Sequence, residues 1–94
     1  MVVIRSFRCL ETRALYEGHR ALRFTNVRAV AERKLQLLDS ANTLGFLRSP
    51  PGNRLEALKG NRAGQHSIRV NDQWRICFVW TDDGPTDVEI VDYH

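Results

Sequence analysis

Long apolar runs and a cysteine framework are both missing from this 94-residue sequence. No run approaches the roughly 20 apolar residues that a helix needs to span a bilayer. The opening segment MVVIRSFRCL lacks a long apolar core followed by small residues, so we expect no signal peptide. The two cysteines, Cys9 and Cys77, lie far apart in the chain and could form one disulfide, but nothing else in the sequence indicates secretion. We therefore expect reduced thiols in a cytoplasmic protein that contacts no membrane.

Motifs for metals, cofactors and covalent catalysis are also missing. The histidines, His19, His66 and His94, do not have metal-ligand spacing, and the cysteines form no CxxC pair. The sequence contains no P-loop, no dinucleotide fingerprint and no GxSxG element. We therefore expect no metal site and no cofactor.

Charge is distributed unevenly along the chain. All 14 Lys and Arg residues lie within residues 1–75, whereas residues 76–94 contain five acidic residues and no Lys or Arg. Twelve of the 14 cations are arginines, whose planar guanidinium binds phosphate in a bidentate way that lysine cannot match. This pattern fits a polyanionic partner, with nucleic acid first, and fits a solvated cationic surface equally well.

Hydrophobic residues make up 43% of the sequence and charged residues 27%, as in ordinary globular proteins. The length predicts a single domain, residues 1–94, with a thin core. Val2–Ile4 predicts a first strand. The helical spacing of Phe7, Leu10, Ala14 and Leu15 predicts a helix with these residues on its apolar face, and Gly18 is a plausible stop. A second helix is predicted after Thr25 or Asn26 as N-cap. Its apolar face comprises Val27, Val30, Ala31, Leu35 and Leu38.

The second half of the chain has the period-two pattern of strands. Strands are predicted over 54–58, 65–70, 73–81 and around 88–91, with a short turn at 44–47 and a hairpin turn at Asn71–Asp72. The expected fold class is α+β, in the order β-α-α-β-β-β, with a two-helix hairpin packed on a mostly antiparallel, twisted sheet. Trp74, Phe78 and Trp80 share one face of their strand with Ile76. This pattern favours a core face under the helices over a base-stacking platform.

The remaining polar residues suggest chemistry on RNA. Metal-free RNA cleavage needs a base for the 2′-OH, cations for the phosphate and an acid for the leaving 5′-oxygen. Lys59 and Arg75 suit the cationic role, and His94 can transfer protons near neutral pH. Asp92 can orient the imidazole, and Tyr93 can stack on a base. Each of these residues could equally be a surface charge or part of a frayed chain end.

A resemblance favours the chemical interpretation. The segment LEALKGNRAGQHSIRVNDQWRICFVW, followed by DVEIVDYH, resembles the HigB toxin family, also known as plasmid maintenance system killer proteins. The IRSF and ERKLQLLDSANTL segments fit as well, so the resemblance covers nearly the whole chain. LxxLKG, NDQWRI and DYH in this order and spacing form a specific signature.

The resemblance implies a RelE-like fold and a toxin that cuts mRNA in the ribosomal A site. It also implies a HigA-type antitoxin with a helix-turn-helix DNA-binding domain. By position, the family's active-site lysine falls on Lys59 and its strand arginine on Arg75. The acid, aromatic residue and histidine of its last motif fall on Asp92, Tyr93 and His94.

This sequence departs from the family pattern at three positions. Some members have a functional histidine three residues before the lysine, where this chain has Glu56. A carboxylate can accept a proton but repels phosphate, so the base stays open between Glu56, Asp92 and a water molecule. Asn61 and His66 replace a common aspartate and a common aromatic residue. His66 either contacts RNA or faces the helices, and its alternation with Ile68 favours the second.

The sequence therefore predicts the toxin of a type II toxin–antitoxin system, a metal-independent, ribosome-dependent mRNA endonuclease. Attack by the 2′-OH would leave a 2′,3′-cyclic phosphate and a 5′-OH. Arg54, Arg62 and Arg69 are the expected RNA-binding residues. The expected partners are the antitoxin, the ribosome and mRNA, with operator DNA reached only through the antitoxin. Two alternatives are a ParE-like poison of DNA gyrase and a ribosome- or RNA-binding module that has lost catalysis.

Overall fold

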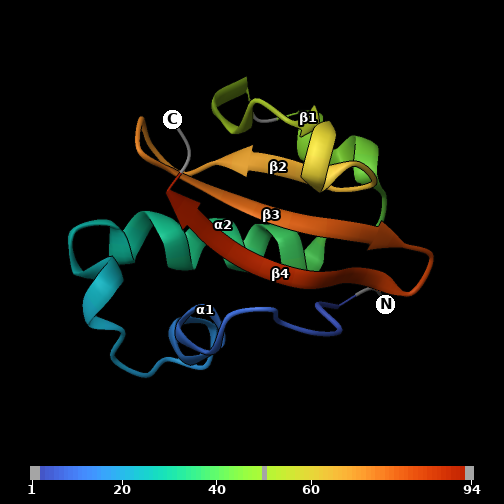
Figure 1. The fold of residues 1–94 in the computed structure, drawn as a ribbon. Coiled ribbons are helices and arrows are strands. Elements are labelled where there is room, and N and C mark those ends of the chain that lie inside the picture. Colours follow the sequence, from blue (N-terminus) through green and yellow to red (C-terminus); the bar gives the residue numbers. More distant parts are fainter. Residues whose placement is uncertain (1–2, 50, 93–94) are drawn as a thin grey trace.

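Figure 1 shows the computed structural model of the protein, which describes residues 3–49 and 51–92. Two helices cover one side of a four-stranded sheet, whose neighbouring strands are all antiparallel in the order β1-β2-β3-β4. This arrangement confirms the predicted α+β class. The elements are α1 (Leu10–Tyr16), α2 (Arg28–Ser40), β1 (Glu56–Ala57), β2 (His66–Arg69), β3 (Trp74–Thr81) and β4 (Gly84–Asp92).

The predicted apolar face of α2 is largely correct. Ala31, Leu35 and Leu38 are fully buried, as the helical spacing requires. The predicted caps are wrong, because a 3₁₀ turn (Leu22–Val27) runs directly into the helix and Val27 becomes the N-cap residue. The Thr25 hydroxyl donates instead to the Leu22 carbonyl at 2.9 Å. No helix in the described part of the chain is long and apolar enough to cross a bilayer.

Helix α1 begins later than predicted and presents a different face. Leu10 was assigned to its apolar face, but this side chain is 83% exposed, whereas Thr12 and Leu15 are buried. The reason is a polar tertiary contact: the Thr12 hydroxyl oxygen accepts a hydrogen bond from the Ile90 amide of β4 at 3.0 Å. That bond turns the Thr12 side of the helix toward the sheet. Gly18 follows the helix at φ +86, a left-handed conformation that suits glycine.

The predicted first strand does not form within the described residues, and Val2 lies outside them. The segment that follows Val3 instead runs beside the free edge of β4 (Figure 1), where Arg5 and Arg8 donate backbone hydrogen bonds to Pro85 and Val88. A bulge between β3 and β4 explains why only an isolated parallel bridge forms there. Asp87 has φ +52, and its amide donates to the Ser6 hydroxyl at 2.9 Å instead of joining a regular ladder.

The strand predicted over 54–58 shrinks to Glu56–Ala57. Arg54 has φ +45, which takes the chain out of the extended conformation just before the strand. The predicted hairpin forms, but its loop covers residues 70–73 and is longer than the tight turn predicted at Asn71–Asp72. In this loop the Asn71 side-chain oxygen accepts the backbone amides of Gln73 and Trp74. A side chain thus supplies the turn hydrogen bonds at a site that lacks glycine.

The aromatic residues of β3 lie on the core side of the sheet, as the face that they share with Ile76 indicated. Trp74 and Phe78 are buried, and Trp80 packs partly against the same cluster. The Phe24 ring meets Trp74 edge to face, with centroids 5.4 Å apart. His66 stacks on Phe78 at 6.3 Å and so lies on this core side of the sheet, which supports the second of its two interpretations.

Candidate functional site

The sheet face turned away from α1 and α2 carries the polar side chains of interest; we call it the open face. Alternation along the strands puts every second residue there. One row across the sheet pairs Arg69 with Arg75 and Arg75 with Val91. The next row pairs Ser67 with Cys77 and Cys77 with Glu89, and Glu56 of β1 lies beside Ser67.

Arg75 is the most enclosed charged residue of the open face, with 9% of its side chain exposed. Its Nε donates to Ser67 Oγ at 2.8 Å, and its Nη2 donates to the Arg54 carbonyl at 2.7 Å. The same Nη2 lies 3.2 Å from Glu56 Oε1. A guanidinium so far from water needs several acceptors, and these three hold it in one orientation.

The Arg54 backbone contributes to this arrangement directly. Its positive φ ends the extended segment and directs its carbonyl to Arg75, while its side chain stays exposed. The structure therefore brings three of the predicted site residues together: Arg54 through its carbonyl, Glu56 through its carboxylate, and Arg75 as the cation between them.

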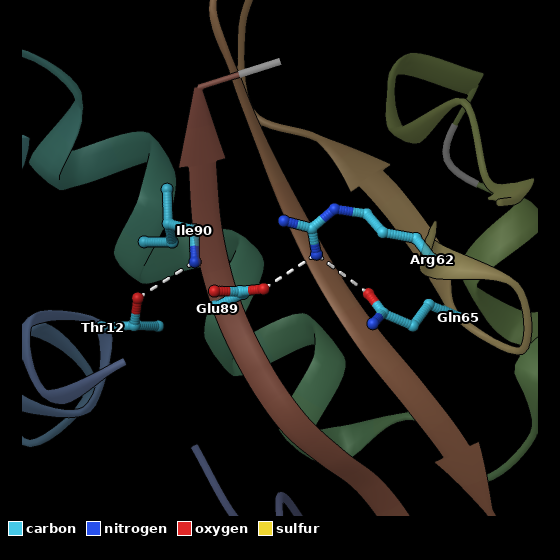
Figure 2. A network of polar contacts seen from close by, with 5 residues as sticks. All are labelled: Thr12, Arg62, Gln65, Glu89 and Ile90. Atoms are coloured by element: carbon cyan, nitrogen blue, oxygen red, sulfur yellow. Dashed lines mark hydrogen bonds and ion pairs between the residues drawn. The ribbon is translucent and has the colours of Figure 1, made fainter. Parts of the chain in front are cut away.

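Arg62 crosses the open face from the connection between β1 and β2 (Figure 2). Its Nη1 contacts Glu89 Oε1 at 2.8 Å and Gln65 Oε1 at 3.1 Å. The Arg62 side chain is 33% exposed and the Glu89 side chain 16% exposed. The predicted RNA-binding role of Arg62 thus falls on a guanidinium that already binds a carboxylate within the protein.

Lys59 and Arg69 lie far apart in the sheet. Lys59 is exposed and precedes the 3₁₀ turn Gly60–Arg62, whereas Arg69 ends β2 and pairs with Asp72 of the hairpin turn. The Leu58 amide donates a hydrogen bond to the Gln65 carbonyl at 2.8 Å. Gln65 lies four residues before Arg69, which pairs with Arg75 across the sheet. At about 3.3 Å per residue, the Leu58–Gln65 contact lies roughly 13 Å along the strands from the Arg69–Arg75 pair, and Lys59 is the residue that follows Leu58.

The last described residue, Asp92, ends β4 opposite Trp74. It follows the alternation of Ile90, so its side chain starts on the Trp74 side of the sheet, not on the open face. Gln73 Nε2 donates to Asp92 Oδ2 at 3.1 Å. Of the predicted site residues, Tyr93 and His94 lie outside the described residues.

Four charges surround the buried thiol of Cys77. Burial raises the pKa of this thiol, and the nearby carboxylates of Glu89 and Glu56 raise it further. The guanidinium groups of Arg62 and Arg75 lower it. The two cations and two anions of the open face therefore oppose one another at this point, and the thiol stays protonated near neutral pH. Among residues 3–49 and 51–92, no cluster of three His, Cys, Asp or Glu side chains could hold a metal ion.

Sequence reasoning missed Ser67, Gln65 and Glu89. Ser67 is fully buried although serine is usually exposed, and nothing in its local sequence marks it as a partner of Arg75. Glu89 had a weak signal, because it is a lone acid between the apolar residues Val88 and Ile90 of one strand. A charge in that position needs a partner once the strand is covered, and Arg62 is that partner.

The sequence of the chain is similar to a known toxin family and to individual proteins. Residues 9–94 match the family described as "RelE-like toxin of type II toxin-antitoxin system HigB". The chain is similar to a protein named Toxin HigB-1 of Vibrio cholerae serotype O1, with 56% identity over 50 residues, which cover 53% of each chain. It is also similar to an uncharacterized protein of Haemophilus influenzae, with 38% identity over 60% of this chain and 55% of the other. The matched part spans about half the length of these relatives.

Proposed function

The chain belongs to the RelE-like toxins of the HigB type, and we propose that it cleaves mRNA on the ribosome as the toxin of a type II toxin–antitoxin system. The observation that best supports this activity is the fixed guanidinium of Arg75, held by Ser67, the Arg54 carbonyl and Glu56 on the open face. A cation that is oriented before the substrate arrives can stabilise the charge of a phosphorane transition state without reorganisation.

In the proposed reaction, the ribose 2′-OH attacks the adjacent phosphorus and loses its proton to a base. The bond to the 5′-oxygen breaks, and that oxygen takes a proton from an acid. Glu56 is the base best supported by geometry, because its carboxylate lies 3.2 Å from Arg75 and is half exposed. Arg75 and Lys59 stabilise the phosphate charge, His94 is the acid, Asp92 assists His94, and Tyr93 stacks on an mRNA base.

The first expected result concerns the ends of the cut RNA. Cleavage of ribosome-bound mRNA should leave a 2′,3′-cyclic phosphate and a 5′-OH, because the attacking nucleophile belongs to the RNA itself. The ends can be identified by enzymatic labelling and mass spectrometry. Fragments with a 3′-OH and a 5′-phosphate would contradict this mechanism, since that pattern belongs to attack by water, which is usually metal-assisted.

The proposed partners follow from the family and from the charge. The arginine-rich body would bind ribosomal RNA through phosphates, a contact that weakens as salt increases. A HigA-type antitoxin with a helix-turn-helix domain would neutralise the toxin in the cytoplasm and would connect it to operator DNA indirectly.

Expression in bacteria should show both properties. We expect induced expression of this protein to arrest growth. Co-expression of a helix-turn-helix protein encoded by the adjacent gene should restore growth, because members of the family are toxins of toxin–antitoxin systems. Plating efficiency with and without the second protein measures the effect. Normal growth at confirmed soluble expression would contradict the toxin assignment. Growth arrest with intact mRNA and inhibited DNA supercoiling would instead favour the gyrase-poison alternative.

A further inference from the structure

The segment that carries Lys59 is a short connection between β1 and β2, residues 59–64. Four backbone hydrogen bonds close it: the Arg62 amide donates to the Lys59 carbonyl at 3.2 Å, the Ala63 amide to the Gly60 carbonyl at 3.1 Å, the Gln65 amide to the Arg62 carbonyl at 3.0 Å, and the Leu58 amide to the Gln65 carbonyl at 2.8 Å. Gly60 and Gly64 both have positive φ, and a β-carbon added to either would meet no atom within 4 Å. These four hydrogen bonds lie within the segment and at its two ends, and none of them reaches β3 or β4.

One side chain connects this segment to the rest of the sheet. The Arg62–Glu89 ion pair joins residues 27 positions apart, reaching from the turn to β4, two strands beyond β2 (Figure 2). Gln65, which follows the segment, accepts a second hydrogen bond from the same Arg62 nitrogen at 3.1 Å. The pair therefore attaches the segment to the far side of the open face.

The two ion pairs within helices do not have this geometry. Arg13–Glu17 and Arg28–Glu32 each join neighbouring turns of one helix, and their side chains are 35–59% exposed. Such exposed pairs contribute little to stability. The Glu89 side chain is only 16% exposed, and its contact with Arg62 is shorter than either helical pair. Removing the Glu89 charge therefore removes a short contact with a partly buried guanidinium.

We propose that Glu89 is a positioning residue, which acts through Arg62 to hold the 59–64 segment against the sheet and so fixes the place of Lys59. The role of Lys59 itself rests on the proposed ribonuclease function. The backbone just before Lys59 is offset from the Arg75 row by roughly 13 Å along the strands, so a phosphate that contacts both side chains leaves little tolerance in the position of Lys59. The Glu89 carboxylate touches neither RNA nor the reacting atoms in this role.

A direct RNA contact by Arg62 leads to the opposite expectation. If Glu89 merely occupied a guanidinium that RNA phosphate should bind, replacing it with a neutral residue would release Arg62. Ribosome binding would then strengthen, and the cleavage rate at saturating ribosomes would not fall. The two interpretations therefore differ in sign for a single substitution, Glu89→Gln, which keeps the side-chain shape and removes the charge.

The decisive measurement is hydrogen exchange of the backbone amides of residues 62, 63 and 65, with no RNA present. Glu89→Gln should speed their exchange by about tenfold, because a charge-assisted contact holding the segment is lost. The matched control is Glu32→Gln, which removes the acid of the exposed Arg28–Glu32 pair on α2. This control should leave exchange at 62–65 unchanged. Equal exchange in wild type and Glu89→Gln would overturn the proposal.

Cleavage of ribosome-bound mRNA tests the consequence for Lys59. Glu89→Gln should lower the single-turnover rate by roughly tenfold at saturating ribosomes, with ribosome affinity retained, as expected for a misplaced group. Exchanging the two charges, Arg62→Glu with Glu89→Arg, should recover most of the rate relative to either single reversal. Faster loop exchange with an unchanged rate would overturn the positioning of Lys59. If wild type cleaves no RNA, the proposed function fails, while the exchange experiment still decides whether Glu89 holds the segment.

Discussion

Arg75→Ala should lower the single-turnover cleavage rate of ribosome-bound mRNA by roughly 100-fold or more, the effect of losing a pre-oriented donor to a developing oxyanion. Arg75 is fixed by Ser67, the Arg54 carbonyl and Glu56 before substrate binds, so its loss removes a transition-state contact. Ribosome affinity should change much less, because the proposed phosphate contacts of the ribosome are mostly with the exposed arginines of the body. The measurement is a rate at saturating ribosomes, together with a separate binding curve.

The substitution also affects the fold, and a matched variant separates the two effects. Arg75→Ala leaves the buried Ser67 hydroxyl without its guanidinium partner, at a cost of about 1–3 kcal/mol. Thr12→Ala removes the buried hydrogen bond to the Ile90 amide on the helix side of the sheet and should cost a similar amount. Thermal unfolding should show comparable losses, yet only Arg75→Ala should lose cleavage. Wild-type cleavage by a folded Arg75→Ala protein would show that the site is elsewhere.

His94→Ala should leave a folded protein that still binds its antitoxin and no longer arrests growth. General acid–base residues typically contribute about 10²–10⁴-fold to a rate, and His94 is the proposed acid for the leaving 5′-oxygen. Removal of residues 93–94 should have the same effect. The fold should survive either change, because Val88 and Ile90 already supply the buried apolar contacts of β4.

Single-turnover cleavage and circular dichroism together test this expectation. A His94→Ala rate within about threefold of wild type would remove His94 from the mechanism. A comparison with Asp92→Asn distinguishes the acid from its proposed helper. Asp92 also accepts a hydrogen bond from Gln73 at the hairpin turn, so Gln73→Ala is the control for the loss of that contact alone.

The period-two pattern predicted the core side of the sheet correctly because it depends on the strand alone. Ile76 and Phe78 alternate toward the helices whatever the rest of the chain does. The orientation of α1 was not predictable in this way. Seven residues give a weak periodic signal, and the contact between Thr12 and the Ile90 amide, 78 positions away, overrode the preference for burying Leu10.

The sequence predicts a candidate site as a list of residues and not as an arrangement. The resemblance singled out Lys59, Glu56 and Arg75, but the contact between the last two depends on strand register. That register follows from the turns between β1, β2 and β3, including a hairpin that Asn71 stabilises through its side chain. Ser67 and Glu89 belong to no motif, because their roles arise only when the strands lie side by side.

The backbone contacts at the rim of β4 bear on aggregation. An uncovered outer strand presents amides and carbonyls that can pair with a strand of another molecule. Here Arg5 and Arg8 donate to carbonyls of β4, and the Ser6 carbonyl accepts the Val88 amide. The bulge at Asp87 further distorts the ladder that an incoming strand would need. The opposite rim, β1, is only two residues long. Neither rim is a good template for intermolecular sheet growth, which favours dispersed molecules over fibrils when the protein accumulates.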